Sequence, residues 1–205
     1  MSAIMNPPAP ATMTPPPVSA GPRPWKWTRE QYFQMAELGY FGDRRVQLIF
    51  GEVVEMPKQN WSHVAGCRKT ADQLRAVFLG VGWVSEQSPL PFSDSAPEPD
   101  AWVVPGRMED CTDHPTTALL IVEVSDTTLT HDMTTKAELY ATASIQECWV
   151  LDLNARCLHV YRDPVPLPNN LGATAYRTHD TLDPADTVSP LAAPNSTITV
   201  SDLLP

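Results

Sequence analysis

The stretch ALLIVEV at positions 118–124 is the most hydrophobic segment of the chain. Its apolar side chains follow one another without the alternation of a strand that has one wet face, which is typical of a strand buried on both faces of a sheet. Glu123 interrupts the run. A carboxylate inside such a strand is costly unless it is paired, hydrogen-bonded or bound to a metal, so Glu123 is the first candidate for function.

Further strands and helices are expected on both sides of this strand. Thr28 begins a capping-box pattern that predicts a helix ending at Leu38, and apolar spacings of four, three and four predict a helix over 63–79. The remaining expected elements are a hairpin with strands at 46–50 and 53–56, strands at 83–87, 101–104, 148–153 and 157–161, a helix over 132–143, and weak strands at 175–178 and 197–200. This order predicts a mixed α/β fold around one sheet.

Composition divides the chain into two parts. Of its 22 prolines, 8 lie within residues 1–24, and residues 1–23 are expected to form a disordered Pro-rich leader. Residues 24–205 are expected to form a single domain with a core at about 46–162. No apolar stretch reaches the roughly 20 residues that span a bilayer, and no signal or transit peptide is recognisable. We expect a cytoplasmic protein with no membrane partner.

The charge of the chain is uneven. The 205 residues carry 24 acidic and 14 basic side chains, a formal net charge of −10, which argues against binding nucleic acid by bulk charge alone. A local basic surface that could meet phosphate is nevertheless expected from Arg44, Arg45, Arg68, Lys69 and Arg75. The four cysteines include no C-x-x-C pair, so we expect reduced thiols and no zinc site built from them.

A second carboxylate lies at the start of another expected strand. Asp100 follows Pro99 directly before the apolar run at 101–104. Asp100 and Glu123 on neighbouring strands would offer the hard oxygen ligands that suit Mg²⁺ or Mn²⁺. The alternatives are a turn aspartate at Asp100 and, at Glu123, a buried carboxylate paired with Arg or Lys.

An ordered set of short motifs runs along the chain. The set comprises Gly51-Glu52, His63 at the start of a helix, Pro99-Asp100, Glu123-Val124-Ser125, Asp132 with Lys136 and Tyr140 at spacings of four, and the run from Glu147 to Asp152. This set resembles the Uma-two restriction endonuclease family, in the PD-(D/E)XK nuclease superfamily. The resemblance covers about residues 28–161 and, more weakly, the tail through Leu204. It implies a restriction-endonuclease-like mixed sheet flanked by helices, with an N-terminal helix and hairpin.

The resemblance implies a divalent-metal-dependent endonuclease that hydrolyses phosphodiester bonds of DNA, with Mg²⁺ or Mn²⁺ as cofactor. It implies that Asp100 and Glu123 ligate the metal. The backbone carbonyl of Val124 and the carboxylate of Glu52 would add further ligands. Without the resemblance, Glu52 is better interpreted as a solvated carboxylate beside a glycine turn.

The sequence departs from the superfamily's simplest pattern at one position. The residue two positions beyond Glu123 faces the same side of the strand and is normally lysine in that pattern, but here it is Ser125. The Uma-two family is similar in this respect, with its lysine on the following helix, so the resemblance implies that Lys136 orients the water or stabilises the transition state. An ion pair between Lys136 and Asp132, four residues before it, is a strong alternative, and both interpretations can hold together. His63 is a secondary catalytic candidate, since a histidine at a helix start is more often exposed or bonded to backbone.

Three aromatic residues that lie in or beside apolar segments are assigned a structural role. Tyr140, Trp149 and Trp102 are expected to pack in the core. Gln47 stands where many relatives appear to carry glutamate, which removes one acidic neighbour from the site.

A second class of function stays open from the sequence. The displaced lysine, the acidic surface and the leader are all compatible with a catalytically inactive nuclease fold that serves as a binding or interaction module. DNA versus RNA preference and a homodimer also stay open. Phosphate-binding loops, dinucleotide fingerprints, serine-hydrolase elbows and H-E-x-x-H zinc motifs are absent, which excludes those enzyme classes.

Overall fold

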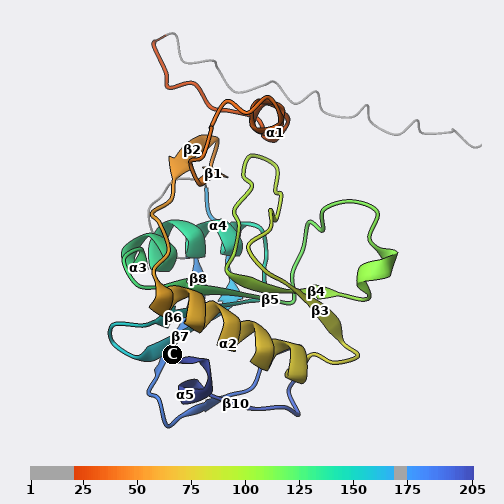
Figure 1. Cartoon of the computed structure of the whole chain (residues 1–205), viewed down its shortest axis with the longest axis vertical. Coiled ribbons are helices and arrows are strands. Elements are labelled where there is room, and N and C mark those ends of the chain that lie inside the picture. Colours follow the sequence, from red (N-terminus) through yellow and green to blue (C-terminus); the bar gives the residue numbers. More distant parts are fainter. Residues whose placement is uncertain (1–20, 169–174) are drawn as a thin grey trace, which may run out of the picture.

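The computed structural model describes residues 21–168 and 175–205 (Figure 1). The expected leader lies almost entirely outside these residues and stays a prediction. None of the helices in the described ranges combines the length and apolarity that crossing a bilayer requires. The elements are α1 (Arg29–Glu37), β1 (Val46–Ile49), β2 (Glu52–Glu55), α2 (Trp61–Val77), β3 (Gly82–Ser85), β4 (Ala101–Pro105), η1 (Met108–Asp110), β5 (Leu120–Ser125), α3 (Leu129–His131), the π-helical turn η2 (Asp132–Lys136), α4 (Ala137–Thr142), β6 (Glu147–Asp152), β7 (Cys157–Pro164), β8 (Tyr176–Leu182), β9 (Thr187–Val188), β10 (Ile198–Thr199) and α5 (Val200–Leu203).

Six strands form one mixed sheet in the order β3-β4-β5-β6-β7-β8. β5 and β6 run parallel, and the other neighbours are antiparallel. Every residue of β5 and β6 is buried, as expected for a strand pair covered on both faces. The predicted mixed α/β fold, with a sheet flanked by helices, is confirmed.

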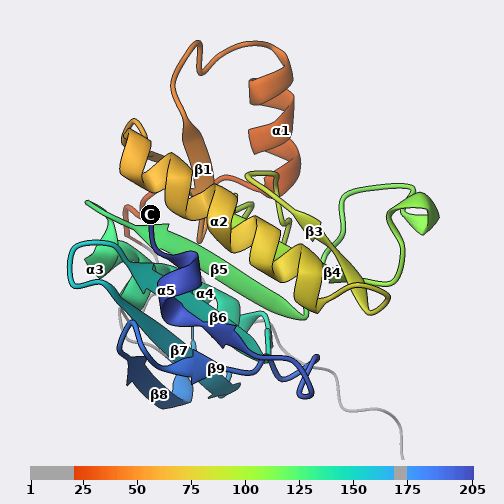
Figure 2. The same ribbon diagram turned by 60° about the horizontal axis from the view of Figure 1, so that its bottom comes forward.

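Alternation along β5 distributes its side chains between two cores. Val122 and Val124 belong to the core under α2 and α5, whereas Ile121 belongs to the core under α4 (Figures 1 and 2). Because successive strand residues point to opposite faces, Glu123 lies on the α4 face with Ile121. The carboxylate is thus directed toward the helix that carries Lys136.

α2 approaches β5 closely at Gly66. A Cβ at this position would lie only 3.0 Å from Val124 Cγ1, so a larger residue would push the helix away from the strand. One turn earlier, His63 occupies the first turn of the helix, and Asn60 caps that turn by accepting a hydrogen bond from the His63 backbone N–H at 2.9 Å. The close approach therefore holds His63 against the end of the sheet.

The N-terminal helix and hairpin form a small unit beside the sheet (Figure 1). The capping box at Thr28 is present as predicted, and the Tyr32 hydroxyl donates to the Val46 carbonyl at 2.9 Å. The hairpin turns at Gly51, whose φ of 74° lies in the left-handed region that favours glycine. Leu48 is fully buried, and its carbonyl accepts from the Ala96 N–H at 2.7 Å. The hairpin is thereby fixed to the segment that leads into Asp100.

Three segments differ from the sequence-based expectation. The helix expected over 132–143 begins at Leu129 and contains a π-helical turn. β8 is longer than the weak strand predicted at 175–178, because hydrogen bonds to β7 hold an exposed, polar sequence in the sheet. Val200, expected at the end of a strand, instead begins α5, which packs its buried Leu203 against the α2 side of the sheet.

Glu147 fastens the C-terminal segment to the sheet. Its buried carboxylate accepts hydrogen bonds from Trp149 Nε1 at 3.0 Å, from the Arg162 guanidinium at 2.9 and 2.6 Å, and from the Leu191 N–H at 2.7 Å. Arg162 also donates to the Ser189 carbonyl at 2.7 Å. One carboxylate therefore ties two strands to the loop before β10.

We predict that Glu147→Ala lowers the free energy of unfolding by about 3–5 kcal/mol, because it leaves Arg162 and two N–H groups without their acceptor. Urea unfolding of both proteins measures this difference. The exposed Glu109→Ala is the matched control and should stay within about 0.5 kcal/mol of the parent. Equal stability of Glu147→Ala and the parent would contradict this role.

Candidate active site

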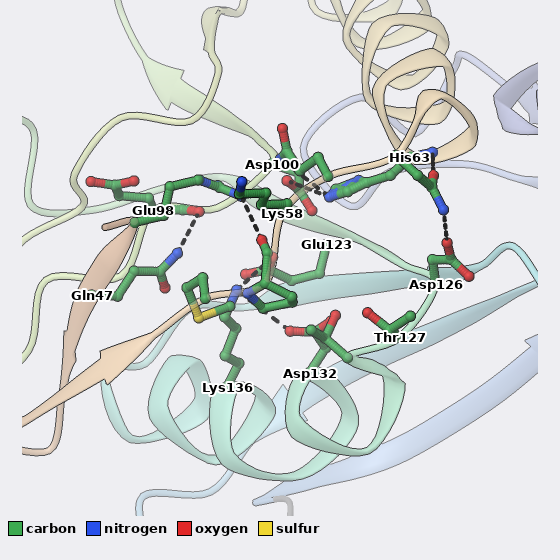
Figure 3. A pocket seen from close by; sticks show the side chains of 16 residues that line it. Gln47, Lys58, His63, Glu98, Asp100, Glu123, Asp126, Thr127, Asp132 and Lys136 are labelled. Carbon is green, nitrogen blue, oxygen red and sulfur yellow. Dashed lines mark hydrogen bonds and ion pairs between the residues drawn. The ribbon is translucent and has the colours of Figure 1, made fainter. Parts of the chain in front are cut away.

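A pocket opens where the hairpin, the start of α2, the start of β4, β5 and the π-helical turn meet (Figure 3). The carboxylates of Asp100, Glu123 and Asp132 point into one region, together with the ammonium group of Lys136. Asp100 is 6% exposed and Glu123 is 1% exposed. The two carboxylates predicted from the sequence are thus brought together at the base of one pocket.

Glu123 is held by two donors from the opposing helix. Oε2 accepts from Lys136 Nζ at 2.9 Å, and Oε1 accepts a hydrogen bond from the Tyr140 hydroxyl. Burial raises the pKa of Glu123 to about 8; repulsion from Asp132 and Asp100 adds to this, while Lys136 acts in the opposite direction. The carboxyl therefore binds a proton more readily than an exposed glutamate does.

Asp100 is fixed by the backbone of β5. Its Oδ2 accepts from the Val124 N–H at 2.9 Å, and its Oδ1 lies 3.4 Å from His63 Nε2 and 3.5 Å from Gln87 Nε2. Burial raises the pKa of Asp100, against the lowering effect of Lys136 and of the Val124 hydrogen bond. The neighbouring residues Ala101 and Val122 pair across β4 and β5, which sets Asp100 beside Glu123.

The π-helical turn brings Asp132 and Lys136 into the same cluster. Asp132 Oδ2 accepts from the hydroxyls of Ser125 and Thr128, both at 2.6 Å, while Oδ1 lies 3.4 Å from Lys136 Nζ and makes no hydrogen bond. Burial alone would lower the pKa of Lys136, but the carboxylates of Glu123, Asp132 and Asp100 outweigh it and raise the pKa. Lys136 therefore stays protonated. The predicted ion pair with Asp132 is present alongside the contact with Glu123.

His63 connects Asp100 to a buried thiol. Its Nδ1 lies 3.3 Å from Cys67 Sγ, and its Nε2 faces Asp100 and the Gln59 side chain. Ligand atoms of His63, Cys67 and Asp100 all lie within 4.8 Å of one another. Burial raises the pKa of Cys67, and the nearby carboxylates of Asp100 and Glu123 raise it further.

Two predicted ligands are not among the residues that line the pocket. Glu52 is exposed at the hairpin turn, where it forms an ion pair with Lys26. Glu52 is the first residue of β2 and directly follows the turn at Gly51, so its side chain lies at the tip of the hairpin. We therefore leave Glu52 out of the proposed ligand set. Val124 contributes its N–H to Asp100, and its carbonyl stays a prediction.

Four residues that were not site candidates in the sequence analysis also belong to this cluster. Gln47 is buried in the pocket wall, and its side-chain nitrogen donates to the Glu98 carbonyl at 3.4 Å. Glu98 lines the pocket, and burial raises its pKa against the influence of Arg45 and Lys136. Two signals were available: Glu98 lies two residues before Asp100 between prolines, and Asp132 lies four before Lys136. Tyr140, expected only to pack in the core, is buried there and also binds Glu123.

The charge balance of the cluster fits a divalent cation. Three buried carboxyl groups, Asp100, Glu123 and Asp132, share one buried ammonium group. In the part of the chain that the structure describes, Lys136 is the only buried basic side chain. When the carboxyl groups are ionised, two negative charges are left uncompensated, which is expensive in a buried site. A hard cation of charge two, bound by carboxylate oxygens, would offset them.

Comparison with known proteins decides the family. A family model described as "Putative restriction endonuclease" and named Uma2 matches residues 29–201. The chain belongs to the Uma2 family. This confirms the resemblance predicted from the motifs and makes the chain, at a coarse level, a member of a nuclease family. No curated protein matches it.

The fold of this Uma2 chain is also found in a solved structure. It is similar to the crystal structure of a putative nuclease belonging to DUF820 from Anabaena variabilis ATCC 29413, with a TM-score of 0.62 and 16% sequence identity. The match covers 86% of this chain and 96% of that one. At this identity the likeness shows a shared fold, which is the restriction-endonuclease-like fold predicted above.

We predict that the metal-free Uma2 protein loses stability as the pH rises from about 5 to 8. The pKa values of Glu123 and Asp100 are raised on folding, so the folded chain holds protons that the unfolded chain has released. This contribution to stability is fully present below the ordinary carboxyl pKa and is lost as the pH rises through the raised pKa of the folded chain. Over that range the free energy of unfolding falls by up to about 1.4 kcal/mol per pH unit for each group. Thermal melting in EDTA at several pH values measures this slope.

Glu123→Gln should flatten this pH dependence. The variant itself is destabilised, because glutamine lacks the negative charge that pairs with Lys136. The exposed Glu55→Gln should keep the slope of the parent. A parent protein whose stability rises over this pH range would refute the raised carboxyl pKa values.

Proposed function

We propose that this Uma2 protein is a divalent-metal-dependent endonuclease that hydrolyses phosphodiester bonds of DNA. The single observation that carries the proposal is the surplus of buried carboxylates around Lys136 at the base of an open pocket. Buried carboxylates that repel one another lower the stability of the fold. When such carboxylates lie at the base of an open pocket, they are characteristic of a functional site. Membership of a nuclease family supports the choice of reaction.

Asp100 and Glu123 are the residues proposed to hold the metal, with the Val124 carbonyl as a further ligand. Carboxylate and carbonyl oxygens are the ligands that Mg²⁺ and Mn²⁺ prefer. When bound, such an ion polarises the phosphate, lowers the pKa of an attacking water and offsets charge in the pentavalent transition state. The Val124 N–H and His63 keep Asp100 oriented toward the pocket.

Lys136 is proposed to place a fixed positive charge beside the reacting phosphate. Its ammonium group already lies 2.9 Å from Glu123 and is kept protonated by the surrounding carboxylates. A buried, preorganised cation stabilises developing negative charge more strongly than a solvated one does. His63 is proposed as a secondary catalytic residue, because its Nε2 faces the pocket and can exchange a proton with a water bound near Asp100.

Basic side chains at the pocket suit a nucleic-acid backbone. Arg45 and Lys58 both line the pocket, so a strand that reaches Asp100 would pass close to both. The wider basic surface expected from the sequence is partly occupied. Lys69 donates to the Leu204 carbonyl at 2.6 Å, and Arg75 pairs with Asp72 and Glu86. Phosphate contacts are therefore proposed at Arg45 and Lys58.

We predict that Mg²⁺ or Mn²⁺ supports cleavage of duplex or branched DNA, and that Asp100→Ala and Glu123→Ala each lower the rate at least about 1,000-fold. Each change removes a ligand of the proposed metal. Cleavage of a labelled substrate, measured across metals and substrates, tests this. Glu55→Ala, which removes an exposed carboxylate from the hairpin, is the matched control and should cleave like the parent. Parental rates in both site variants would sink the proposal.

A second candidate function is a nuclease fold that serves as a binding or interaction module without turnover. The specific observation in its favour is that both oxygens of Glu123 are already hydrogen-bonded to the protein. A buried carboxylate whose two oxygens are both hydrogen-bonded can stabilise the fold without a bound cation. The two candidates differ in their response to metal.

We predict that Mn²⁺ raises the melting temperature of the parent, because a ligand that binds only the folded state stabilises it by about 2.7 kcal/mol at 100 times its Kd. For a chain of this size that corresponds to roughly 5–10 °C. Differential scanning fluorimetry of the parent and Asp100→Asn measures the shift, which the variant should lose. A parent without any shift would favour the binding module.

A further inference from the structure

A second group of metal-ligand side chains lies outside the residues that line the candidate active site. It forms where β6 turns into β7, two neighbouring strands of the sheet (Figure 2). Asp152 ends β6 and pairs directly with Cys157, the first residue of β7, and His159 follows two residues later on the same side of the strand. One ligand atom of each residue lies within 4.8 Å of the others.

The imidazole of His159 has a different partner at each nitrogen. Nε2 lies 3.7 Å from Cys157 Sγ. Nδ1 lies 3.1 Å from His179 Nε2 and 3.1 Å from Thr181 Oγ1, both on β8. A histidine that binds a metal through one nitrogen almost always bonds through the other to a neighbouring acceptor. β8 therefore supplies the outer contact that leaves His159 Nε2 free to bind a cation.

The ligands are held by the sheet and not by a loose loop. Asp152 Oδ1 accepts from the backbone N–H groups of Asn154 and Ala155, both at 2.9 Å, which orients the carboxylate. The His179 ring stacks on Tyr161 with ring centroids 4.3 Å apart. Because Asp152 and Cys157 are buried, little chain entropy would be lost when they bind an ion.

We propose that Asp152, Cys157 and His159 form a site for a divalent transition-metal ion of the zinc type. One thiolate, one imidazole and one carboxylate suit Zn²⁺, which binds sulfur at about 2.3 Å and nitrogen at about 2.0–2.1 Å. A small contraction of the three ligands would give these distances, with water in a fourth position. On binding, Cys157 loses its thiol proton to solvent as the sulfur–metal bond forms.

This site revises the expectation that the cysteines form no zinc site. That expectation rested on the missing C-x-x-C pair, whereas the proposed ligands follow the spacing D-x₄-C-x-H across a tight turn between two strands. It is chemically distinct from the proposed hard-cation site, whose main ligands are oxygens. A bound ion would link β6 to β7 directly, and to β8 through His179 and Thr181.

Cobalt is the probe that tests the proposal on the full chain. Co²⁺ takes the place of Zn²⁺ in tetrahedral sites, and a cysteine ligand gives a thiolate-to-cobalt charge-transfer band in the near ultraviolet. The parent should show this band, and Zn²⁺ should displace it. Cys157→Ser should abolish it, and His159→Gln should weaken Co²⁺ binding at least about 100-fold, while the double variant His179→Ala/Thr181→Ala weakens it about 10–100-fold.

Two cysteine variants serve as matched controls. Cys67→Ser removes the thiol of the group at His63 and Asp100, and Cys111→Ser removes an exposed thiol; both should keep the band. Loss of the band in Cys67→Ser, its survival in Cys157→Ser, or its absence in the parent would overturn the proposal. Circular dichroism checks that each variant is folded. Since the readout is metal binding at Cys157, its outcome does not depend on whether the protein cleaves DNA.

Discussion

Glu123 places a carboxylate inside a strand whose every residue is buried, and much of the structure accommodates that group. Removing such a charge from water costs several kcal/mol unless partners meet it at close range. Lys136 and Tyr140 supply those partners from the helix that covers this face. The docking of α4 on β5 is therefore an electrostatic requirement as well as a packing contact, and losing either partner would leave a buried polar group unsatisfied.

One helical segment meets this requirement with several side chains. Residues spaced by four lie on one face of a helix, so Asp132, Lys136 and Tyr140 all face the strand that carries Glu123. The first of these intervals, Asp132–Lys136, is a π-helical turn. Ser125, at the end of β5, and Thr128 donate hydrogen bonds to Oδ2 of Asp132. Irregular backbone and buried charge occur together here, as they often do at functional sites.

The same arrangement explains how distant segments form one pocket. Asp100 is positioned by strand pairing and by the Val124 N–H, and His63 by the approach of α2 at Gly66. Gln47 and Glu98 are added because the hairpin binds to the segment before Asp100 through Leu48 and Ala96. The DUF820 protein from Anabaena variabilis shares the overall fold at 16% identity, so the fold itself tolerates extensive change in sequence.

Hydrophobic periodicity and a carboxylate in an apolar run are local signals, so the amino-acid sequence predicts the α/β class, the central strand, the long helix α2 and the candidates Asp100 and Glu123. The family resemblance added Lys136, which lies against Glu123, and Glu52, which is exposed beside Lys26 at the hairpin turn. Tertiary contacts brought Tyr140 to Glu123, placed the Asp132–Lys136 ion pair in the same pocket as Glu123 and Asp100, and brought Cys157 and His159 beside Asp152. Those groupings depend on strand register, helix docking and a π-helical turn, which are set by contacts between residues far apart in the chain.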